Sequence, residues 1–385
     1  MADHGFGLYV HWPFCAAKCP YCDFNSHVAP AIDHDRWAEM YGVEMETLAR
    51  QSGRTGQPLD SIFIGGGTPS LMAPHVMAAI LAAAKRIFTF SPAIEITMEA
   101  NPTSIEASRL DAFAAAGVGR LSMGIQSLDD TALVALGREH GRDEALQALA
   151  TARSVFARVS ADFIYARPGQ NSDQWRAELA TILDLGLDHL SLYQLTLEPG
   201  TAFYSRHQRG LLTLPDDETG RRLYDITAMM TADAGLAAYE ISNHARVGEA
   251  CQHNLVYWRA GDWLGVGPGA YGRYWQGSQR IETRSRRDPA AWLDDVATKG
   301  EALDQSRPDS AFDTASEIMM MGLRLDEGVD LNRLQRLPGY DASWIDKNDL
   351  TRLADAGLVT LRGDMLQLTP SGRPVINAVL GTLLG

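Results

Sequence analysis

Three of the four cysteines of the chain lie close together near its start, where Cys15, Cys19 and Cys22 have the spacing C-x3-C-x2-C. Three thiolates on one short loop can hold three irons of a 4Fe-4S cluster. The fourth iron then has no protein ligand and can bind a substrate or cofactor, as the open position of a catalytic metal does. The spacing therefore predicts a cluster with one open iron.

Two other interpretations of the cysteines remain open. Free cysteines often pack as small apolar side chains, but their clustering within one loop argues against that interpretation. A zinc ion is the second alternative, and it would need a fourth ligand. The candidates for that ligand are His11, His27 and Cys251.

The cysteine spacing, with Tyr21 directly before the third cysteine, resembles the radical S-adenosylmethionine (SAM) superfamily. The resemblance implies that the open iron chelates the amino and carboxylate groups of SAM. It also implies that one electron from the cluster breaks the sulfonium and yields a 5′-deoxyadenosyl radical. Such chemistry belongs to the cofactors, and the protein contributes their position and the exclusion of water.

Composition limits the classes of partner. The 385 residues include 34 basic and 48 acidic ones, a net charge of -14, which argues against broad nucleic-acid binding. No apolar run approaches the ~20 residues of a membrane span, so we expect no integral membrane segment. The first residues lack the basic and apolar regions of a signal peptide. We therefore expect a cytoplasmic, reducing location, in which thiolates stay available for iron.

The order of elements predicts how these residues are positioned. Short apolar segments at 7–13, 61–64, 95–100, 120–125, 159–165 and 189–195 alternate with helical patterns. This alternation predicts an α/β fold with a parallel sheet, which we interpret as a six-unit partial (β/α) barrel over residues 1–205. Ligands of such sheets bind at the carboxyl ends of the strands. The cysteine loop, residues 65–68, Glu99, Gln126 and Asp162 all fall at or near those ends.

The alternation ends after residue 205. In the segment 206–300 we expect one helix at 215–234, a strand at 239–242, and a glycine-rich run at 264–272. Residues 301–385 predict a separate winged-helix-like domain, with two helices followed by a terminal hairpin. Because this domain has few basic residues, we expect it to pack or bind a partner, and not DNA.

Several polar residues of the barrel have a functional and a plain interpretation. The glycines at 65–67 allow close approach of a ligand to bare backbone, or form an ordinary turn. Glu99 could pair with an ammonium or a ribose hydroxyl, or be a solvated or capping carboxylate. Asp162 lies in an apolar strand, where an unpaired charge would be costly, so we expect a ligand or arginine partner. Arg138 and His140 could serve a carboxylate.

A narrower resemblance covers nearly the whole chain. Oxygen-independent coproporphyrinogen III oxidases and their relatives resemble it at the stretches YVHWPFC, CPYCDF, IGGGTPS, MEANP, LSMGIQS, LGREH, DFIYARPGQ, YEISNHA, HNLVYW and GVGPGAYG. The resemblance implies that the cluster ligands are Cys15, Cys19 and Cys22. The SAM contacts that it implies are Tyr9, Tyr21, Gly66, Gly67, Thr68, Glu99, Gln126, Arg138, Asp162 and Thr196.

Two departures from the oxidases distinguish between branches of this family. The oxidases carry a fourth cysteine where this chain has Phe24, and they have a long N-terminal extension. The HNxxYW segment at 253–258 is instead similar to the HemW branch, whose members are proposed to be haem chaperones. That likeness implies one bound haem with His253 as its iron ligand. The alternatives are that His253 is structural, or that Cys251 is an axial or covalent attachment point.

Around such a haem, Tyr257 and Trp258 would supply apolar flanks, and the glycine-rich run would approach the other face. We therefore expect a haem chaperone that uses a cluster, SAM, a one-electron donor and a haem-accepting protein. The alternative function is oxidative decarboxylation of coproporphyrinogen III to protoporphyrinogen IX. Phe24 favours the chaperone, whereas the intact SAM motifs keep SAM cleavage and the oxidase in play.

Overall fold

A computed structural model describes residues 4–385, so the first three residues, on which the signal-peptide expectation partly rests, lie outside it. Its main body is one 12-stranded sheet in the order β12-β11-β10-β9-β1-β2-β3-β4-β5-β6-β8-β7. The first six strands are consecutive parallel neighbours, which confirms the six-unit partial barrel. They are β1 (Phe6–Trp12), β2 (Pro58–Gly66), β3 (Thr89–Ala100), β4 (Arg120–Gln126), β5 (Arg158–Tyr165) and β6 (His189–Gln194).

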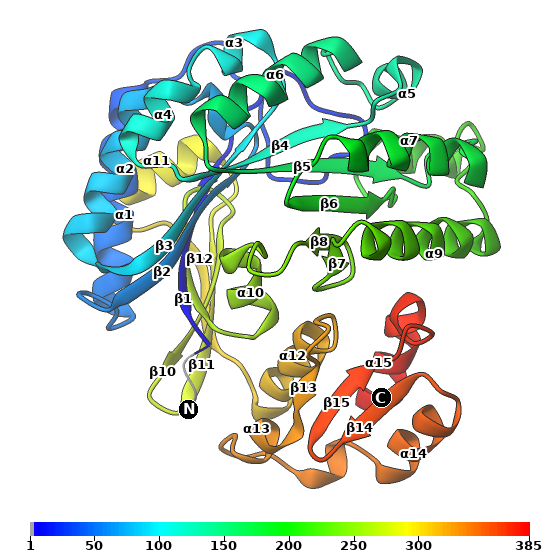
Figure 1. The fold of residues 1–385 in the computed structure, drawn as a ribbon. Helices are drawn as coiled ribbons and strands as arrows, with labels where there is room; N and C mark the ends of the chain where they lie inside the picture. Colours follow the sequence, from blue (N-terminus) through cyan, green and yellow to red (C-terminus); the bar gives the residue numbers. More distant parts are fainter. Residues whose placement is uncertain (1–3) are drawn as a thin grey trace.

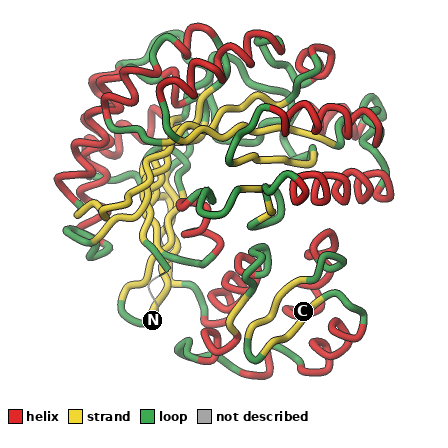
Figure 2. The backbone as a smooth tube through the Cα atoms, viewed as in Figure 1, coloured by secondary structure: helices red, strands yellow, loops and turns green. Residues whose placement is uncertain are grey.

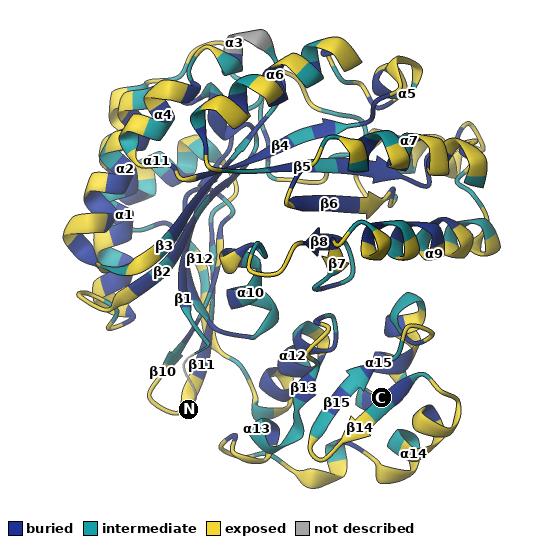
Figure 3. Ribbon diagram, in the orientation of Figure 1, coloured by how far each residue is buried: buried dark blue, intermediate teal, exposed yellow. Residues whose placement is uncertain are grey.

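Helices cover the convex face of this curved sheet (Figure 1). The longer helices bury an apolar stripe against the sheet, as α1 does with Trp37, Tyr41 and Met45, and leave the opposite face exposed (Figure 3). The longer helices are α1 (His34–Gln51), α2 (Pro74–Ile87), α6 (Arg142–Val155), α7 (Ser172–Asp184) and α9 (Asp217–Asp233), and the shorter ones are α3 (Ser104–Ala107), α4 (Leu110–Ala116), α5 (Asp130–Ala135) and α8 (Ala202–Gln208). In the described part of the chain, no helix is both long and apolar enough to cross a membrane.

The segment 206–300 extends both edges of the same sheet. At one edge, β9 (Asp262–Val266) runs parallel to β1, and β10 (Tyr271–Gln276) and β11 (Gln279–Ser285) follow antiparallel; β12 (Leu303–Pro308), just beyond residue 300, continues this edge. At the other edge lie β8 (Asn243–Ala245) and β7 (Ala237–Ala238). Two helices complete the segment: α10 (Gln252–Trp258) packs against β1, β2 and β9, and α11 (Pro289–Lys299) packs against α1.

The expected strand at 239–242 was wrong. Residues 239–242 form a bend, because the Glu240 carboxylate accepts hydrogen bonds from Ser242 N (2.8 Å) and Asn243 Nδ2 (2.6 Å) and holds the turn. The glycine-rich run has a packing role, and its suggested approach to a haem stays a prediction. A Cβ on Gly267, whose φ is +104°, would lie 2.4 Å from the His11 carbonyl oxygen, so this glycine lets the β9–β10 connection pack on β1.

The C-terminal residues form a smaller body with a core of its own, built on Ile318, Leu334, Leu366 and Val379. Figures 1 and 2 show its helices around a three-stranded sheet in the order β13-β15-β14, which confirms the winged-helix-like arrangement. Its elements are α12 (Ala311–Gly322), β13 (Val329–Asp330), α13 (Leu331–Gln335), α14 (Lys347–Asp355), β14 (Val359–Arg362), β15 (Met365–Leu368) and α15 (Ile376–Leu384). The domain boundaries at residues 205 and 300 stay predictions.

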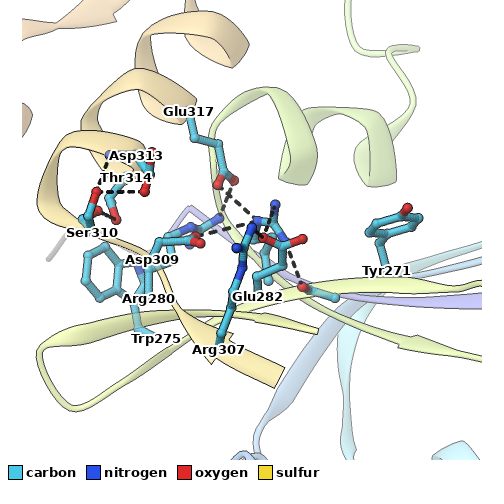
Figure 4. Close-up of polar contacts among 12 residues, drawn as sticks. Tyr271, Trp275, Arg280, Glu282, Arg307, Asp309, Ser310, Asp313, Thr314 and Glu317 are labelled. Atoms are coloured by element: carbon cyan, nitrogen blue, oxygen red, sulfur yellow. Dashed lines mark hydrogen bonds and ion pairs between the residues drawn. The ribbon is translucent and has the colours of Figure 1, made fainter. Parts of the chain in front are cut away.

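A buried ionic network joins this body to the sheet (Figure 4). The fully buried guanidinium of Arg280 on β11 pairs with Glu317 of α12 at 3.2 Å and with Asp262 of β9 at 3.4 Å. Arg273 of β10 reaches the same Glu317 carboxylate at 3.1 Å. Because each buried charge has an opposite partner, the network fixes α12 against the sheet without leaving an isolated charge.

Candidate functional site

A cavity of about 730 Å³ opens at the carboxyl ends of β1 to β6, and we call it the outer cavity. The structure brings most of the predicted site residues to its walls, although they come from seven separate places in the sequence. Those that line it are Cys15, Cys19, Tyr21, Cys22, Gly66, Gly67, Thr68, Glu99, Gln126, Arg138, Asp162 and Thr196. Two predicted residues, Tyr9 and His253, lie elsewhere.

The cysteine loop follows directly from β1 and presents three partly exposed thiols to the outer cavity. Thr68 donates to Cys15 Sγ at 3.3 Å, and Arg138 Nη1 lies 3.5 Å from Cys19 Sγ. Burial raises the pKa of both Cys15 and Cys22, so bound iron would be needed to keep these thiols ionised. The Thr68 hydroxyl and the Arg138 guanidinium can therefore stabilise negative charge on the cysteine sulfurs or on a group bound to them.

The zinc alternative lacks a fourth ligand at this loop. Both ring nitrogens of His11 are engaged, with Tyr9 OH and with the Asn25 carbonyl oxygen, each at 2.9 Å. His27 Nε2 contacts Asn25 Oδ1 at 3.3 Å, and Cys251 is not at the outer cavity. Within residues 4–385, no group of three or more histidine, cysteine or acidic side chains is placed to hold a single metal ion. Three thiols around a cavity with no fourth ligand fit a cluster with an open iron.

The glycine run at the end of β2 has a packing role that the sequence did not reveal. A Cβ on Gly66 would lie 2.6 Å from the His11 ring, and one on Gly67 would lie 2.6 Å from the Phe14 carbonyl oxygen. Gly67 N donates to Trp12 O at 2.7 Å. The bare backbone therefore lets this turn approach the cysteine loop, while its other side lines the outer cavity.

Two carboxyl groups face each other inside the barrel. Burial, together with the nearby Asp162, raises the pKa of Glu99 to about 8, although its carboxylate accepts a hydrogen bond from Gly66 N at 3.0 Å. Burial also raises the pKa of Asp162, which accepts hydrogen bonds from Ser122 Oγ at 3.2 and 3.3 Å. A hydrogen bond with Ser191 and the charges of Arg120 and Arg138 act in the opposite direction on the pKa of Asp162, so the expected arginine partners of this carboxyl are present. The pair is thus suited to a ligand that brings positive charge or hydroxyl groups.

Near the end of β4, Gln126 has an uncommon backbone conformation, and hydrogen bonds hold the Arg138 guanidinium in place. Gln126 ends β4 with φ of +70°, a left-handed conformation that is uncommon for a residue with a side chain and is often found at functional sites. Arg138 donates to Asn101 Oδ1 at 2.5 Å and to the Gly124 carbonyl at 2.9 Å, which fixes its guanidinium at the cavity wall. His140, by contrast, contacts Ile125 O at 3.0 Å and does not line the cavity.

Comparison with known proteins agrees with this geometry. Residues 9–182 match the radical SAM superfamily, and residues 310–375 match the HemN C-terminal domain. A protein from Escherichia coli K12 named heme chaperone HemW is 34% identical, covering 98% of this chain and 97% of its own. One of the same name from Mycobacterium tuberculosis is 35% identical, covering 100% and 96%. This chain belongs to the HemW family of radical SAM proteins.

One further relative has a different name, and one solved structure has the same fold. The mitochondrial radical S-adenosyl methionine domain-containing protein 1 of Bos taurus is 39% identical, covering 98% of this chain and 87% of its own. Coproporphyrinogen III oxidase (HemN) from Escherichia coli superposes with a TM-score of 0.80 at 23% identity, covering 99% and 90% of the two chains, and shows the shared fold. Membership in the radical SAM superfamily implies a 4Fe-4S cluster and SAM as cofactors.

The HNxxYW segment of this HemW-family chain lies in a separate space inside the barrel. His253 is 1% exposed, and its Nδ1 and Nε2 contact Ser61 Oγ at 2.9 Å and Tyr257 OH at 2.8 Å. Burial lowers the pKa of His253 to about 3, so the ring is neutral. It lines a cavity of about 190 Å³, the inner chamber, which is smaller than the roughly 300–1,000 Å³ of typical small-molecule pockets.

The neighbours of His253 only partly match the predicted haem flanks. The Tyr257 ring packs edge-on against His253 at 4.6 Å, whereas the Trp258 ring lies beneath the guanidinium of Arg324 at 5.8 Å. Cys251 is buried, its Sγ contacts Glu95 Oε1 at 3.4 Å, and burial raises its pKa to about 12. An iron ligand at His253 therefore requires that one of its two hydrogen bonds break, and the role of this residue stays a prediction.

Several residues that line the outer cavity were not predicted from the sequence. Arg324, Ile376 and Asn377 reach it from the C-terminal domain, and Tyr193 and Tyr224 from β6 and α9. No local pattern marks these residues, because they meet the cysteine loop only through the fold. Asn101 was the exception that could have been found, since it directly follows the strand that carries Glu99 and lies within the quoted MEANP stretch.

Proposed function

We propose that this chain is a haem chaperone, which binds haem and passes it to an acceptor protein. The observation that carries the proposal is its likeness, over nearly the full length, to proteins named heme chaperone HemW. A second observation favours it over the oxidase alternative. Phe24 stands where the oxidases have a further cysteine, and its side chain is 55% exposed beside the cysteine loop.

The same proposal assigns the cofactor site to the outer cavity. Cys15, Cys19 and Cys22 would hold the cluster, which when bound supplies one electron from a donor protein. Thr68 and Arg138 would stabilise its charge through their contacts with the thiol sulfurs. Glu99 would accept a hydrogen bond or pair with a cation of SAM, and the C-terminal domain would help exclude water. Because these thiols must stay reduced, the proposal includes a reducing, intracellular compartment.

Haem titration after anaerobic reconstitution tests this function. Growth of a Soret band that saturates at one haem per chain is expected for the wild type. The His253→Ala variant is expected to bind more weakly and with a changed spectrum, whereas His244→Ala, which alters a buried histidine outside both cavities, is the control. Failure of the wild type to bind haem contradicts the function. Unchanged binding by His253→Ala contradicts only the ligand assignment.

A further inference from the structure

A buried hydroxyl lies beside the cysteine loop without a hydrogen-bond partner. Ser26 is 6% exposed, and its Oγ is sealed from solvent and forms no hydrogen bond with any described residue. Burying a hydroxyl without a partner is costly, so this atom calls for an explanation. Ser26 follows Cys22 by four residues and is among the residues around the outer cavity.

The Ser26 hydroxyl lies near the sulfurs of Cys15 and Cys22. Burial raises the pKa of both thiols, and the nearby Ser26 hydroxyl acts on both in the opposite direction. A neutral thiol is only a weak hydrogen-bond acceptor. A thiolate that binds iron carries negative charge and accepts hydrogen bonds much more strongly. The partner that the hydroxyl lacks is therefore the one that a bound cluster would create.

The segment around Ser26 is held in place on both sides. Cys15 N donates to the His27 carbonyl oxygen at 2.9 Å, which joins this segment to the start of the cysteine loop. Asn25 Nδ2 donates to the Pro268 carbonyl oxygen at 2.9 Å, which joins it to the β9–β10 connection. The hydroxyl is therefore positioned beside the sulfurs by the fold itself, as is typical of groups that support metal ligands.

We propose that Ser26 is a positioning residue, whose hydroxyl donates to the iron-bound sulfur of Cys15 or Cys22 and raises the reduction potential of the cluster. Thr68 donates to Cys15, whereas Ser26 supplies a side-chain donor near Cys22 as well. Reduction adds one negative charge to a cluster, so a hydrogen bond to its sulfur is stronger in the reduced form and favours reduction. The inference rests on the cluster of the proposed function and does not depend on haem binding.

Redox titration of the anaerobically reconstituted full-length protein, followed by EPR, tests this assignment. Ser26→Ala removes the hydroxyl and Ser26→Thr retains one, so the threonine variant should restore most of the loss. Ser285→Ala removes another buried hydroxyl without a partner, on β11 and outside both cavities, and is the matched control. Thr68→Val removes the donor that contacts Cys15 and shows how sensitive the measurement is.

We expect Ser26→Ala to lower the equilibrium constant for one-electron reduction about three- to tenfold, which corresponds to roughly 30–60 mV, while Ser285→Ala leaves it unchanged. Because the hydroxyl has no partner in the cluster-free protein, Ser26→Ala should not lower the free energy of unfolding of that form, as urea titration would show. A lower potential then reflects the lost hydrogen bond and not a damaged fold.

The remaining outcomes also decide the question. If Ser26→Ala folds but assembles no cluster, while Ser26→Thr does, the hydroxyl is required and the inference holds. The inference is overturned if Ser26→Ala keeps the wild-type potential, or if it destabilises the cluster-free protein, since the hydroxyl would then have a structural role. A wild type that assembles no cluster contradicts the cofactor assignment together with this inference, whereas absence of haem binding contradicts the proposed function alone.

Discussion

The pKa of Glu99 predicts how SAM affinity depends on pH. This carboxyl lies at the wall of the outer cavity, where burial and the neighbouring Asp162 raise its pKa to about 8. The neutral form is therefore favoured in the absence of ligand, and ionisation follows as the pH rises through that value. If the ionised carboxylate is what pairs with the positively charged ligand, SAM binds best above the pKa of Glu99.

The size of the effect follows from the ionised fraction. With a pKa of about 8, roughly a tenth of the Glu99 carboxyls are ionised at pH 7 and roughly nine tenths at pH 9. Apparent affinity scales with the fraction of protein in the competent form, so the dissociation constant should fall about tenfold between these two pH values. Below pH 7, each further unit should weaken binding by about another factor of ten.

Equilibrium dialysis of labelled SAM against the anaerobically reconstituted protein from pH 6 to 9 measures this slope. The Glu99→Gln variant keeps the shape but cannot ionise, so its affinity should vary much less with pH. It also controls for the amino group of SAM, which titrates at about 8 and affects both proteins equally. An affinity of the wild type that does not change with pH, or an equal slope in the variant, would refute the role of Glu99.

Three further outcomes are expected. Alanine at any one of the three loop cysteines should prevent assembly of a stable cluster, whereas Cys251→Ala should retain it, as iron and sulfide analysis would show; equal loss in Cys251→Ala contradicts the open-iron model. Gly67→Ala should lower the free energy of unfolding by about 1–3 kcal/mol in urea titrations, because its Cβ would meet the Phe14 backbone, while Gly119→Ala, with no neighbour near its Cβ, should not. The reconstituted protein with SAM and reductant should not convert coproporphyrinogen III to protoporphyrinogen IX, and detection of that product by chromatography would restore the oxidase alternative.

The barrel could be predicted because its signals are local. Each of the first six strands is a short apolar run followed by a helix with an apolar stripe, and parallel strands bring their carboxyl ends to one edge. Residues at those ends were therefore expected near one another, and the structure brings them to one cavity. Their individual roles toward the cluster and SAM stay predictions.

The strands β9 to β12 could not be predicted, because polar residues among them obscure which side chains are buried. The β11 sequence QRIETRS contains two arginines, yet Arg280 is fully buried by partners on β9 and α12. Arg120 was overlooked for the same reason, since a charged residue at the start of a strand normally indicates a solvated end. Nothing in the sequence shows that the barrel closes around it.

The ionic network of Figure 4 also constrains how a haem could enter. The C-terminal domain supplies part of the outer cavity wall, and α12 is held to the sheet through Glu317 and two arginines. Swinging this domain away would remove Glu317 from Arg280 and Arg273 and leave Arg280 with Asp262 alone, and breaking a buried pair typically costs about 3–5 kcal/mol. Exchange of a large ligand is therefore expected to move side chains at the cavity mouth, such as Arg324 and Asn377, while the domain stays in place.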